Sequence, residues 1–399
     1  MREVIKKSVK SIGLDPGRIK GWLIGLTGSN VARNVCHTKY DKRALIAYII
    51  TPFKDENFNS NHQNAWQVME LARILSSYGY NVDAIPYVDP YVHLKGKYDL
   101  VIAQFPKDCD CYTRHLKPDA IKIAYITTSS PEFNNSAELG RLSDLKERTG
   151  KQLKAYRQLP PMTDDIYSYD AALVMSNKKN ADTYSFLPKT YFINNTSKDV
   201  DMEEDYSDKD PKCFMYLGSV GQVHKGLDLL LEIFSEKDFP CELYVCGAYE
   251  HERDFYDVYR DILFNTPNIH PMDVVDTSGE IYRDVARKCA FMIGPSCAEG
   301  MSGAVLTSMA SGVIPIVSAE SGFDGDEVIL LDDCNKECIR ETVIQYSHRD
   351  TRWITDNSNK CKDIIRNNYM MDNYRDSVNK ALAEIVEHHV DAGKHVGKR

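Results

Sequence analysis

The sequence predicts an α/β protein made of two successive domains, each a parallel sheet covered by helices. Three observations lead to this prediction. From Arg43 onward, short apolar strand-like segments alternate with amphipathic helical segments, a pattern typical of parallel sheets. A polar, acidic stretch at 199–212 divides this alternation into two halves. The chain has 399 residues, about twice the usual length of one domain.

The first half, residues 43–198, opens with an apolar strand at Ala44–Ile50. A helix over about 62–78 follows, because apolar residues recur there at helical spacing and Gly79 suits a helix C-terminus. The remaining strands predicted in this half are Val82–Ile85, Leu100–Ala103, Ile121–Ile126 and Ala171–Met175.

The second half, residues 213–365, repeats the alternation, and residues 366–399 form a helical, charged tail. Its predicted strands are Cys213–Leu217, Glu242–Cys246, Ala290–Ile293 and Val313–Val317. Its predicted helices are Gly226–Ser235, Glu250–Leu263 and one near Ser302–Ser311. Ligands of such sheets bind beyond the carboxyl ends of the strands, so the loops that follow the strands carry the candidate site.

Composition excludes several classes of protein. The longest apolar runs, such as Ala44–Ile50, are far shorter than the roughly 18 residues of a membrane span. A net charge of −9 argues against nucleic acid as the main partner. The 11 cysteines include no paired CxxC motifs, so we expect reduced cysteines in a cytoplasmic protein and no metal site.

The N-terminal extension, residues 1–42, is basic. Residues 1–50 hold ten lysines and arginines against three acidic residues, and Ile5, Val9 and Ile12 recur at helical spacing. Two interpretations stay open: a surface helix packed on the first domain, which we favour, or a helix that lies on an anionic membrane. No secretory signal is expected, because no apolar stretch with a small-residue cleavage site follows Met1.

Three loops of the second half carry the candidate chemistry. The first, Leu217–Gly226, places glycines and Lys225 between a strand and a helix, where backbone N–H groups and a cation can hold a diphosphate. It lacks the Walker order, and a plain tight turn would explain it equally well. In the second, Gly294–Gly303, Glu299 could accept hydrogen bonds from sugar hydroxyls or be a solvated loop acid. In the third, 268–275, a nucleotide base or ribose could lie against the backbone.

The order of these motifs resembles the C-terminal domain of GT-B glycosyltransferases, in particular the retaining family 4, "glycosyl transferases group 1". The matching elements are the glycine loop at 218–226 and the pattern PSxxEGxxGxVLxxMASGxxPI at 295–316. The resemblance spans roughly residues 43–390 and is concentrated in 213–320. It implies two Rossmann-like domains facing each other across a cleft, and sugar transfer from a nucleotide diphosphate sugar with retention.

The resemblance also implies roles for individual residues. Lys225, Glu299 and His62 are the expected catalytic-site residues, and no metal or cofactor besides the donor is expected. The base of the nucleotide is left open. The expected donor-binding residues are Gly218, Ser219, Lys225, Val274, Glu299, Gly300, Met301, Ser302, Gly303 and Thr307.

Two positions depart from the family pattern. The second glutamate of the family motif, which normally holds the ribose, is Thr307 here. Threonine can form one hydrogen bond to a hydroxyl but no charge-assisted pair. The arginine that usually follows the glycine of the first loop is Ser219. One cation is therefore missing unless Arg253 or His224 replaces it.

Polar residues of the first half could contact an acceptor. His62 could touch the sugar or acceptor, or cap the helix it begins; Thr127–Ser130 follows a predicted strand. Asn134, Asn135, Glu138, Arg141 and Arg157 could either contact the acceptor or hold a long excursion of the chain in place.

The leading hypothesis is a cytoplasmic glycosyltransferase, with a nucleotide-sugar donor in the second domain and a glycan or lipid-linked acceptor approaching from the first. Under the second interpretation of the basic N-terminus, it would provide a peripheral membrane contact. The alternative is a non-catalytic GT-B-like subunit that binds a glycan or supports a partner transferase. A Rossmann-type oxidoreductase is excluded, because the loop at 51–61 after the first strand has no glycine.

Overall fold

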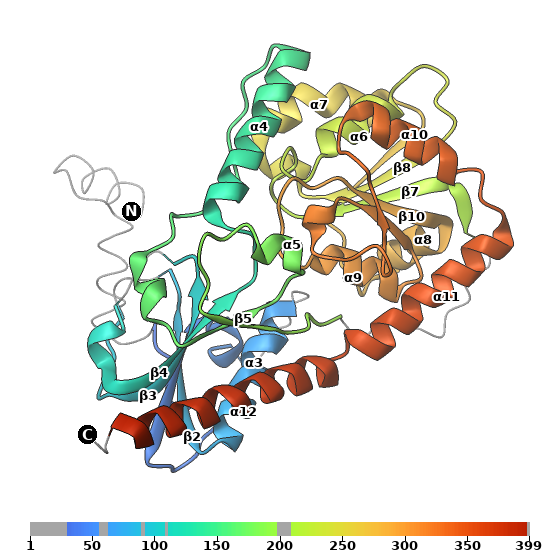
Figure 1. Ribbon diagram of the computed structural model, residues 1–399. Coiled ribbons are helices and arrows are strands. Elements are labelled where there is room, and N and C mark those ends of the chain that lie inside the picture. Colours follow the sequence, from blue (N-terminus) through green and yellow to red (C-terminus); the bar gives the residue numbers. More distant parts are fainter. Residues whose placement is uncertain (1–29, 56–62, 89–91, 108–110, 198–208, 397–399) are drawn as a thin grey trace.

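The computed structural model describes residues 30–55, 63–88, 92–107, 111–197 and 209–396, and it shows two parallel six-stranded sheets (Figure 1). This confirms the predicted fold class, two Rossmann-like α/β domains with a helical C-terminal tail. The predicted basic helix in residues 1–29 and His62 lie outside the described residues, as do residues 198–208 of the acidic stretch.

The N-terminal sheet has the strand order β2-β1-β3-β4-β5-β6, with every neighbouring pair parallel. Most residues of these strands are buried, apart from those of the edge strand and the start of the fourth strand in this order. Two helices pack on one face of the sheet, and segments that include Val92, Tyr112 and Ile166 cover the other. The strands are β1 (Lys42–Tyr48), β2 (Tyr80–Pro86), β3 (Tyr98–Phe105), β4 (Leu116–Ile126), β5 (Ala171–Val174) and β6 (Lys189–Phe192). The helices of this region are α3 (Gln63–Ser77), α4 (Pro131–Thr149) and the short α5 (Lys178–Ala181).

The C-terminal sheet has the order β12-β11-β10-β7-β8-β9, also parallel throughout. Its strands are β7 (Asp210–Gly218), β8 (Glu242–Gly247), β9 (Ile269–Asp273), β10 (Cys289–Gly294), β11 (Ile314–Val317) and β12 (Ile329–Leu330). Its helices are α6 (Leu227–Phe234), α7 (Arg253–Asn265), α8 (Glu280–Lys288), α9 (Gly303–Ala310), α10 (Lys336–Tyr346) and α11 (Thr351–Asn368). Single 3-10 turns occur at Thr51–Phe53, Thr113–His115, Asp164–Ser168, Tyr249–His251 and Ala319–Ser321.

The last helix, α12 (Met371–Val396), returns to the N-terminal domain and lies beside α3 (Figure 1). Its apolar face is buried in the N-terminal core through Tyr374, Val378 and Leu382. The hydroxyl of Tyr374 lies 3.1 Å from that of Tyr125 on β4. The chain therefore begins and ends its described part in the same domain.

Helix α4 extends in the opposite direction, from the N-terminal domain onto the C-terminal domain. It begins directly after β4, where the Ser130 side chain caps it by accepting from the Phe133 N–H at 3.2 Å. Leu142 and Leu145 are buried in the core of the C-terminal domain, and Figure 1 shows α4 reaching toward α6 and α7. Arg148 pairs with the buried Asp228 on α6 at 2.5 Å.

The predicted strands and helices occur, with boundaries shifted by a few residues. β7 begins at Asp210, three residues before the predicted Cys213, and α3 begins at Gln63. Helices α5 and α8 and strands β6, β9 and β12 were not predicted. β9 lies inside the predicted loop 268–275, and β12 has only two residues, too few to produce a periodic pattern. None of the described helices is both long and apolar enough to cross a membrane. The described residues hold no disulfide and no group of three or more metal-ligating side chains.

Candidate active site

The two motif loops lie at the position where an α/β sheet binds ligands. In the C-terminal sheet, β7 and β10 are neighbours, and the chain leaves them toward opposite edges of the sheet. The loop 217–226 follows β7 and the loop 294–303 follows β10. The crevice at such a switch point is the usual ligand position in doubly wound sheets. The topology therefore explains why these two loops face a common space.

The N-terminal sheet presents its own switch point to the same space. β1 and β3 are neighbours there, and Ile49 after β1 and Gln104 on β3 line the same cavity as the motif loops. Together the two domains enclose a cavity of about 510 Å³. Its C-terminal wall contains Gly218, Ser219, Lys225, Val275, Thr277, Glu299, Gly300, Met301, Ser302, Gly303, Ala304 and Thr307.

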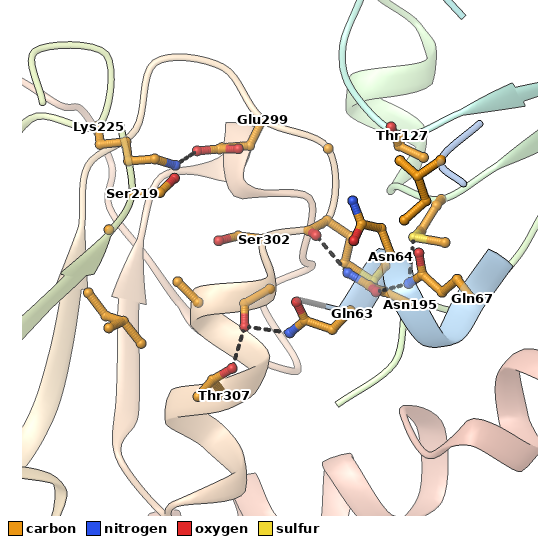
Figure 2. A pocket seen from close by; sticks show the side chains of 18 of the residues that line it. Gln63, Asn64, Gln67, Thr127, Asn195, Ser219, Lys225, Glu299, Ser302 and Thr307 are labelled. Atoms are coloured by element: carbon orange, nitrogen blue, oxygen red, sulfur yellow. Dashed lines mark hydrogen bonds and ion pairs between the residues drawn. The ribbon is translucent and has the colours of Figure 1, made fainter. Parts of the chain in front are cut away.

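Glu299 and Lys225 form an ion pair inside this cavity, although they lie 74 residues apart in the sequence (Figure 2). The two side chains are about nine-tenths buried. Burial raises the pKa of Glu299, but the positive charges of Lys225 and Arg157 outweigh this and hold it at about 2. Glu299 is therefore an anion at neutral pH and can only accept hydrogen bonds.

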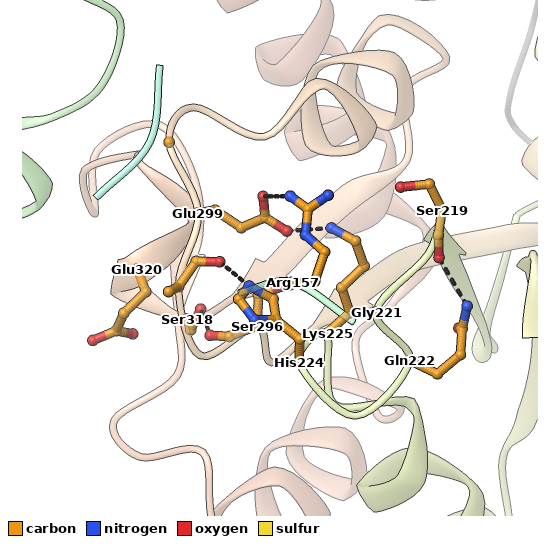
Figure 3. A network of polar contacts seen from close by, with 12 residues as sticks. Arg157, Ser219, Gly221, Gln222, His224, Lys225, Ser296, Glu299, Ser318 and Glu320 are labelled. Atoms are coloured by element: carbon orange, nitrogen blue, oxygen red, sulfur yellow. Dashed lines mark hydrogen bonds and ion pairs between the residues drawn. The ribbon is translucent and has the colours of Figure 1, made fainter. Parts of the chain in front are cut away.

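Arg157 is a second cation beside Glu299 (Figure 3). Its Nη2 lies 3.9 Å from Oε2 of Glu299, and the side chain is 40% exposed. Arg157 belongs to the segment that follows α4, so it reaches the C-terminal loops from the N-terminal half of the chain. Its side-chain stem covers Gly221, whose φ of +98° and lack of a Cβ allow this contact.

Polar side chains on α4 hold the segment that follows this helix and contains Arg157. The carboxylate of Glu138, which is buried, accepts from the backbone N–H groups of Tyr156 and Arg157, both at 2.9 Å. Asn134 donates to the carbonyl of Arg157 at 2.7 Å, and Asn135 donates to that of Leu159 at 2.8 Å. For Asn134, Asn135 and Glu138 the structure shows the second predicted role, because they hold the segment after α4 in place. Arg141 instead donates to the carbonyl of Pro295 at 2.7 Å.

A buried acid that the sequence analysis missed occupies part of the glycine loop. The carboxylate of Glu252 accepts from the N–H groups of Gly221 and Gln222. Burial raises the pKa of Glu252, and these two backbone N–H groups oppose the rise. A single acid at the start of a predicted helix gives no signal in one sequence. These two N–H groups are therefore already bonded, whereas the backbone expected to hold the diphosphate lies at Gly218 and Ser219.

His224 and Arg253, the two predicted substitutes for the missing arginine, lie in different settings. His224 is buried, and its Nε2 bonds to the carbonyl of Ala298. Burial lowers the pKa of His224, so its ring is neutral near pH 7. Arg253 is largely exposed on α7, where it pairs with Asp257 at 2.8 Å. Of these two residues, neither brings a positive charge to the cavity.

The loop from Glu299 to Gly303 is fixed by the N-terminal domain. Asn195 donates to the carbonyl of Met301 at 2.8 Å and Gln63 to that of Gly303 at 3.2 Å (Figure 2). The Ser129 N–H donates to the carbonyl of Glu299 at 3.0 Å. Gly300 packs so closely on the N-terminal domain that a Cβ there would lie 1.9 Å from the carbonyl oxygen of Thr127.

The remaining predicted donor residues are placed as follows. Ser219 and Ser302 line the cavity, as does Thr307, whose hydroxyl donates to the carbonyl of Gly303 at 2.8 Å. Val274 is 61% exposed, and its neighbour Val275 lines the cavity instead. The N-terminal wall, which sequence reasoning largely missed, is rich in amides and tyrosines: Tyr48, Ile49, Gln63, Asn64, Gln67, Tyr87, Gln104, Thr127, Met175 and Asn195.

Residues 211–347 match the family model described as "Glycosyl transferases group 1". No curated protein sequence matches the chain. Among solved structures, the sucrose-phosphate synthase from Thermosynechococcus elongatus has 12% identity and a TM-score of 0.57, covering 87% of this chain and 99% of that one. An E. coli trehalose-6-phosphate protein bound with UDP-2-fluoro glucose has 8% identity and a TM-score of 0.57, covering 86% and 99%.

TarM is also similar, with 12% identity and a TM-score of 0.50 over 72% of this chain. The chain covers 54% of TarM's length. These identities are low, so the similarities speak for the fold. The matched residues contain β7 except its first residue, β8 to β12, both motif loops, Lys225 and Glu299. By these comparisons, residues 211–347 resemble the glycosyl transferases group 1, and the two domains together have the GT-B fold.

Proposed function

We propose that this protein transfers a sugar from a nucleotide diphosphate sugar to a hydroxyl of a glycan or lipid-linked acceptor, with retention at the anomeric carbon. One observation carries the proposal. Lys225 and Glu299, both in the part of the chain that matches the transferase family, meet in a cavity between the switch points of the two sheets. A cation and a carboxylate in one enclosed site suit a ligand that carries both phosphate and hydroxyl groups.

The donor would lie against the C-terminal wall. Lys225 would contact the diphosphate, and Glu299 would accept hydrogen bonds from hydroxyls of the sugar. Gly300 to Gly303 would line the sugar pocket with backbone. The Anabaena HepE structure holds UDP and glucose, and the E. coli structure holds UDP-2-fluoro glucose. We therefore expect a uridine nucleotide to be the first donor worth testing.

In the proposed reaction, the bond between the anomeric carbon and the diphosphate oxygen breaks, and its electron pair stays on the diphosphate. The acceptor hydroxyl oxygen bonds to the anomeric carbon on the same face, and its proton passes to the leaving phosphate oxygen. Negative charge grows on the diphosphate as the bond breaks, so a fixed cation such as Lys225 lowers the barrier. The scheme requires no carboxylate nucleophile and no side-chain base.

The acceptor would lie against the N-terminal wall. Among the described residues of that wall, the side chains are amides, tyrosines, the hydroxyl of Thr127 and apolar groups, apart from Arg157. Tyr48 and Tyr87 lie with ring centroids 6.4 Å apart at the edge of the cavity. Amides and aromatic faces contact neutral hydroxylated molecules well. This composition supports a sugar or another polyol as the group that enters the cavity.

We further propose that the cytoplasmic enzyme meets a lipid-linked acceptor at a membrane surface through the basic residues 1–42. The support is the excess of lysine and arginine with apolar residues at helical spacing. Vesicles with and without anionic lipid test this idea in a flotation assay with the full chain and with a chain lacking residues 1–30. Equal binding of the two chains to anionic vesicles would contradict it.

A non-catalytic, ligand-binding subunit is the second candidate. Thr307 supports it, because its hydroxyl proton is committed to the carbonyl of Gly303, which leaves only an acceptor for a ribose hydroxyl. The absence of charge at Ser219 points the same way. Such a subunit would bind a nucleotide or a glycan without turning it over.

A thermal-shift panel of UDP, GDP and ADP with their sugar conjugates distinguishes these functions. A ligand at 100 times its dissociation constant stabilises the native state by about 2.7 kcal/mol. We expect one nucleotide family to raise the melting temperature, and its sugar conjugate to raise it further. In Glu299→Ala the added effect of the sugar should vanish, while the diphosphate still binds, because two cations remain. The exposed Glu147→Ala is the matched control.

Release of the nucleoside diphosphate in the presence of candidate acceptors then measures transfer. Turnover by wild type and its loss in Glu299→Ala would support the transferase. Nucleotide binding without turnover for any acceptor tested would support the binding subunit. A panel in which no nucleotide shifts the wild-type protein would contradict the transferase and favour a subunit that binds a glycan.

A further inference from the structure

Among the described residues that line the cavity, two carry a positive charge and one carries a negative charge. Lys225 already forms a close ion pair with Glu299, whereas Arg157 stands farther off, at 3.9 Å from the same carboxylate. His224 is neutral, so it adds no charge to this group. Lys225, Arg157 and Glu299 together therefore carry a net charge of +1 in a largely buried space, and this excess favours an anionic ligand.

Two N–H groups of the glycine loop are not available to that anion. The N–H groups of Gly221 and Gln222 are bonded to Glu252. Ser219 stands at the cavity wall without a charge. Helix α6 begins after Gly226, whose N–H bonds to the carbonyl of Val223. Lys225 is the only cationic side chain of the loop 217–226 that lines the cavity, so a second cation for a diphosphate would have to come from another segment.

The fold holds the backbone of Arg157 rigidly but leaves its guanidinium accessible. Glu138 and Asn134 fix the N–H and the carbonyl of Arg157, as described above. The aliphatic part of its side chain packs on Gly221. The head group is part-exposed and faces Glu299 and Lys225 (Figure 3). An arginine whose backbone and aliphatic chain are held in place, while its guanidinium stays accessible, loses little conformational entropy when it binds phosphate.

We propose that Arg157 is a donor-binding residue that supplies the second cation to the diphosphate, in the place that Ser219 leaves uncharged. This cation would come from the N-terminal half of the chain, because Arg157 lies in the segment that follows α4 and reaches across the domain interface. This inference rests on the proposed function, because the anion is the diphosphate of the sugar donor. Donor binding would then depend on α4 being docked on the C-terminal domain.

Isothermal titration tests this with the nucleoside diphosphate that stabilises wild type and with the matching monophosphate. Loss of a charge-assisted contact should weaken diphosphate binding by Arg157→Ala about 10- to 100-fold, and monophosphate binding by less than about 3-fold. Arg157→Lys should recover part of the loss. Lys154→Ala removes an exposed charge three residues away on the same excursion, outside the cavity, and should bind like wild type.

A rescue variant separates binding from structural damage. Ser219 is exposed at the cavity wall, so Arg157→Ala combined with Ser219→Arg returns a cation to the same space. We expect this double variant to regain at least tenfold in diphosphate affinity over Arg157→Ala, with an unchanged melting temperature of the unliganded protein.

Two results would overturn the inference. One is a diphosphate affinity of Arg157→Ala within about 2-fold of wild type. The other is an equal loss for diphosphate, monophosphate and nucleoside, which would mean that Arg157 only shapes the site. Both results presuppose that wild type binds a nucleoside diphosphate, so they leave the proposed function standing. Failure of wild type to bind any nucleoside diphosphate would instead reject the function itself.

Discussion

At the scale of single residues, the most informative group is Glu299. Its carboxylate is about nine-tenths buried, which alone would favour the neutral acid. Lys225 and Arg157 reverse this preference and hold its pKa at about 2. The site therefore holds a carboxylate between two cations. The phosphate groups of a ligand would contact the cations, and its hydroxyl groups would contact the carboxylate.

The low pKa of Glu299 makes a prediction about stability in acid. A glutamate that ionises near 4.5 when unfolded and near 2 when folded stabilises the protein above pH 4.5, and this contribution is lost as pH falls toward 2. Glu299→Gln lacks the contribution at every pH. Urea unfolding should therefore show wild type more stable than Glu299→Gln by roughly 2–3 kcal/mol at pH 6, and by about 1 kcal/mol at pH 3.

The exposed Glu147→Gln is the control, with an expected change below about 0.5 kcal/mol at both pH values. A stability gap for Glu299→Gln that stays constant from pH 6 to pH 3 would show that Glu299 has an ordinary pKa in the folded state.

Sequence reasoning placed Lys225 and Glu299 together in the donor site but named Arg157 only as a possible acceptor contact or structural residue, and the difference has a physical cause. Lys225 and Glu299 lie in loops that directly follow strands, so the alternation of strands and helices places them at the same sheet edge. Arg157 reaches the cavity through a tertiary contact, the docking of α4 on the other domain. No local pattern encodes which domain an amphipathic helix will cover.

At the scale of elements, the loop from Glu299 to Gly303 depends on close contact with the N-terminal domain. Gly300→Ala would place a methyl group 1.9 Å from the Thr127 carbonyl oxygen, and this backbone cannot move without shifting β4. We expect a loss of about 1–3 kcal/mol in unfolding free energy and weaker donor binding. Denaturant titration and nucleotide titration measure the two effects.

Gly140→Ala is the matched control. Gly140 lies in the interior of α4, where no atom would come within 4 Å of a new Cβ. Alanine there should leave binding unchanged and stabilise the protein by about 0.5–1 kcal/mol, because it restricts the unfolded chain and favours the helix. Wild-type stability in Gly300→Ala would mean that the two domains do not meet at this loop.

The docking of α4 rests partly on a buried charge. Burial raises the pKa of Asp228 to about 6, and Arg148 opposes that rise. Arg148→Ala leaves Asp228 without its partner and should cost about 3 kcal/mol at pH 8. At pH 5 the cost should be smaller, since Asp228 can then take up a proton and needs no cation. Urea unfolding at the two pH values measures the difference.

The exposed pair of Arg253 and Asp257 on α7 supplies the control. Arg253→Ala should change stability by about 0.5 kcal/mol or less at either pH. A cost for Arg148→Ala that is the same at pH 5 and pH 8 would contradict a buried, titrating Asp228.

At the scale of the whole molecule, two helices cross between the domains in opposite directions, so that each domain contributes a helix to the core of the other. α4 leaves the N-terminal domain and adds Leu142 and Leu145 to the C-terminal core. α12 follows the C-terminal domain and adds Val378 and Leu382 to the N-terminal core. The sequence predicted that the tail is helical but not where it packs, because an amphipathic pattern shows that a face is buried and does not identify its partner.

The two crossings predict that the domains unfold together. If one domain melts, the other loses a helix that covers its own core, so neither is complete alone. Calorimetry of wild type should show one transition, with equal calorimetric and van't Hoff enthalpies. Leu382→Ala damages only the N-terminal core and should cost about 2–5 kcal/mol. We expect it to move the whole transition to lower temperature. Two separate transitions, of which Leu382→Ala shifts one, would show that the domains are thermodynamically independent despite the crossings.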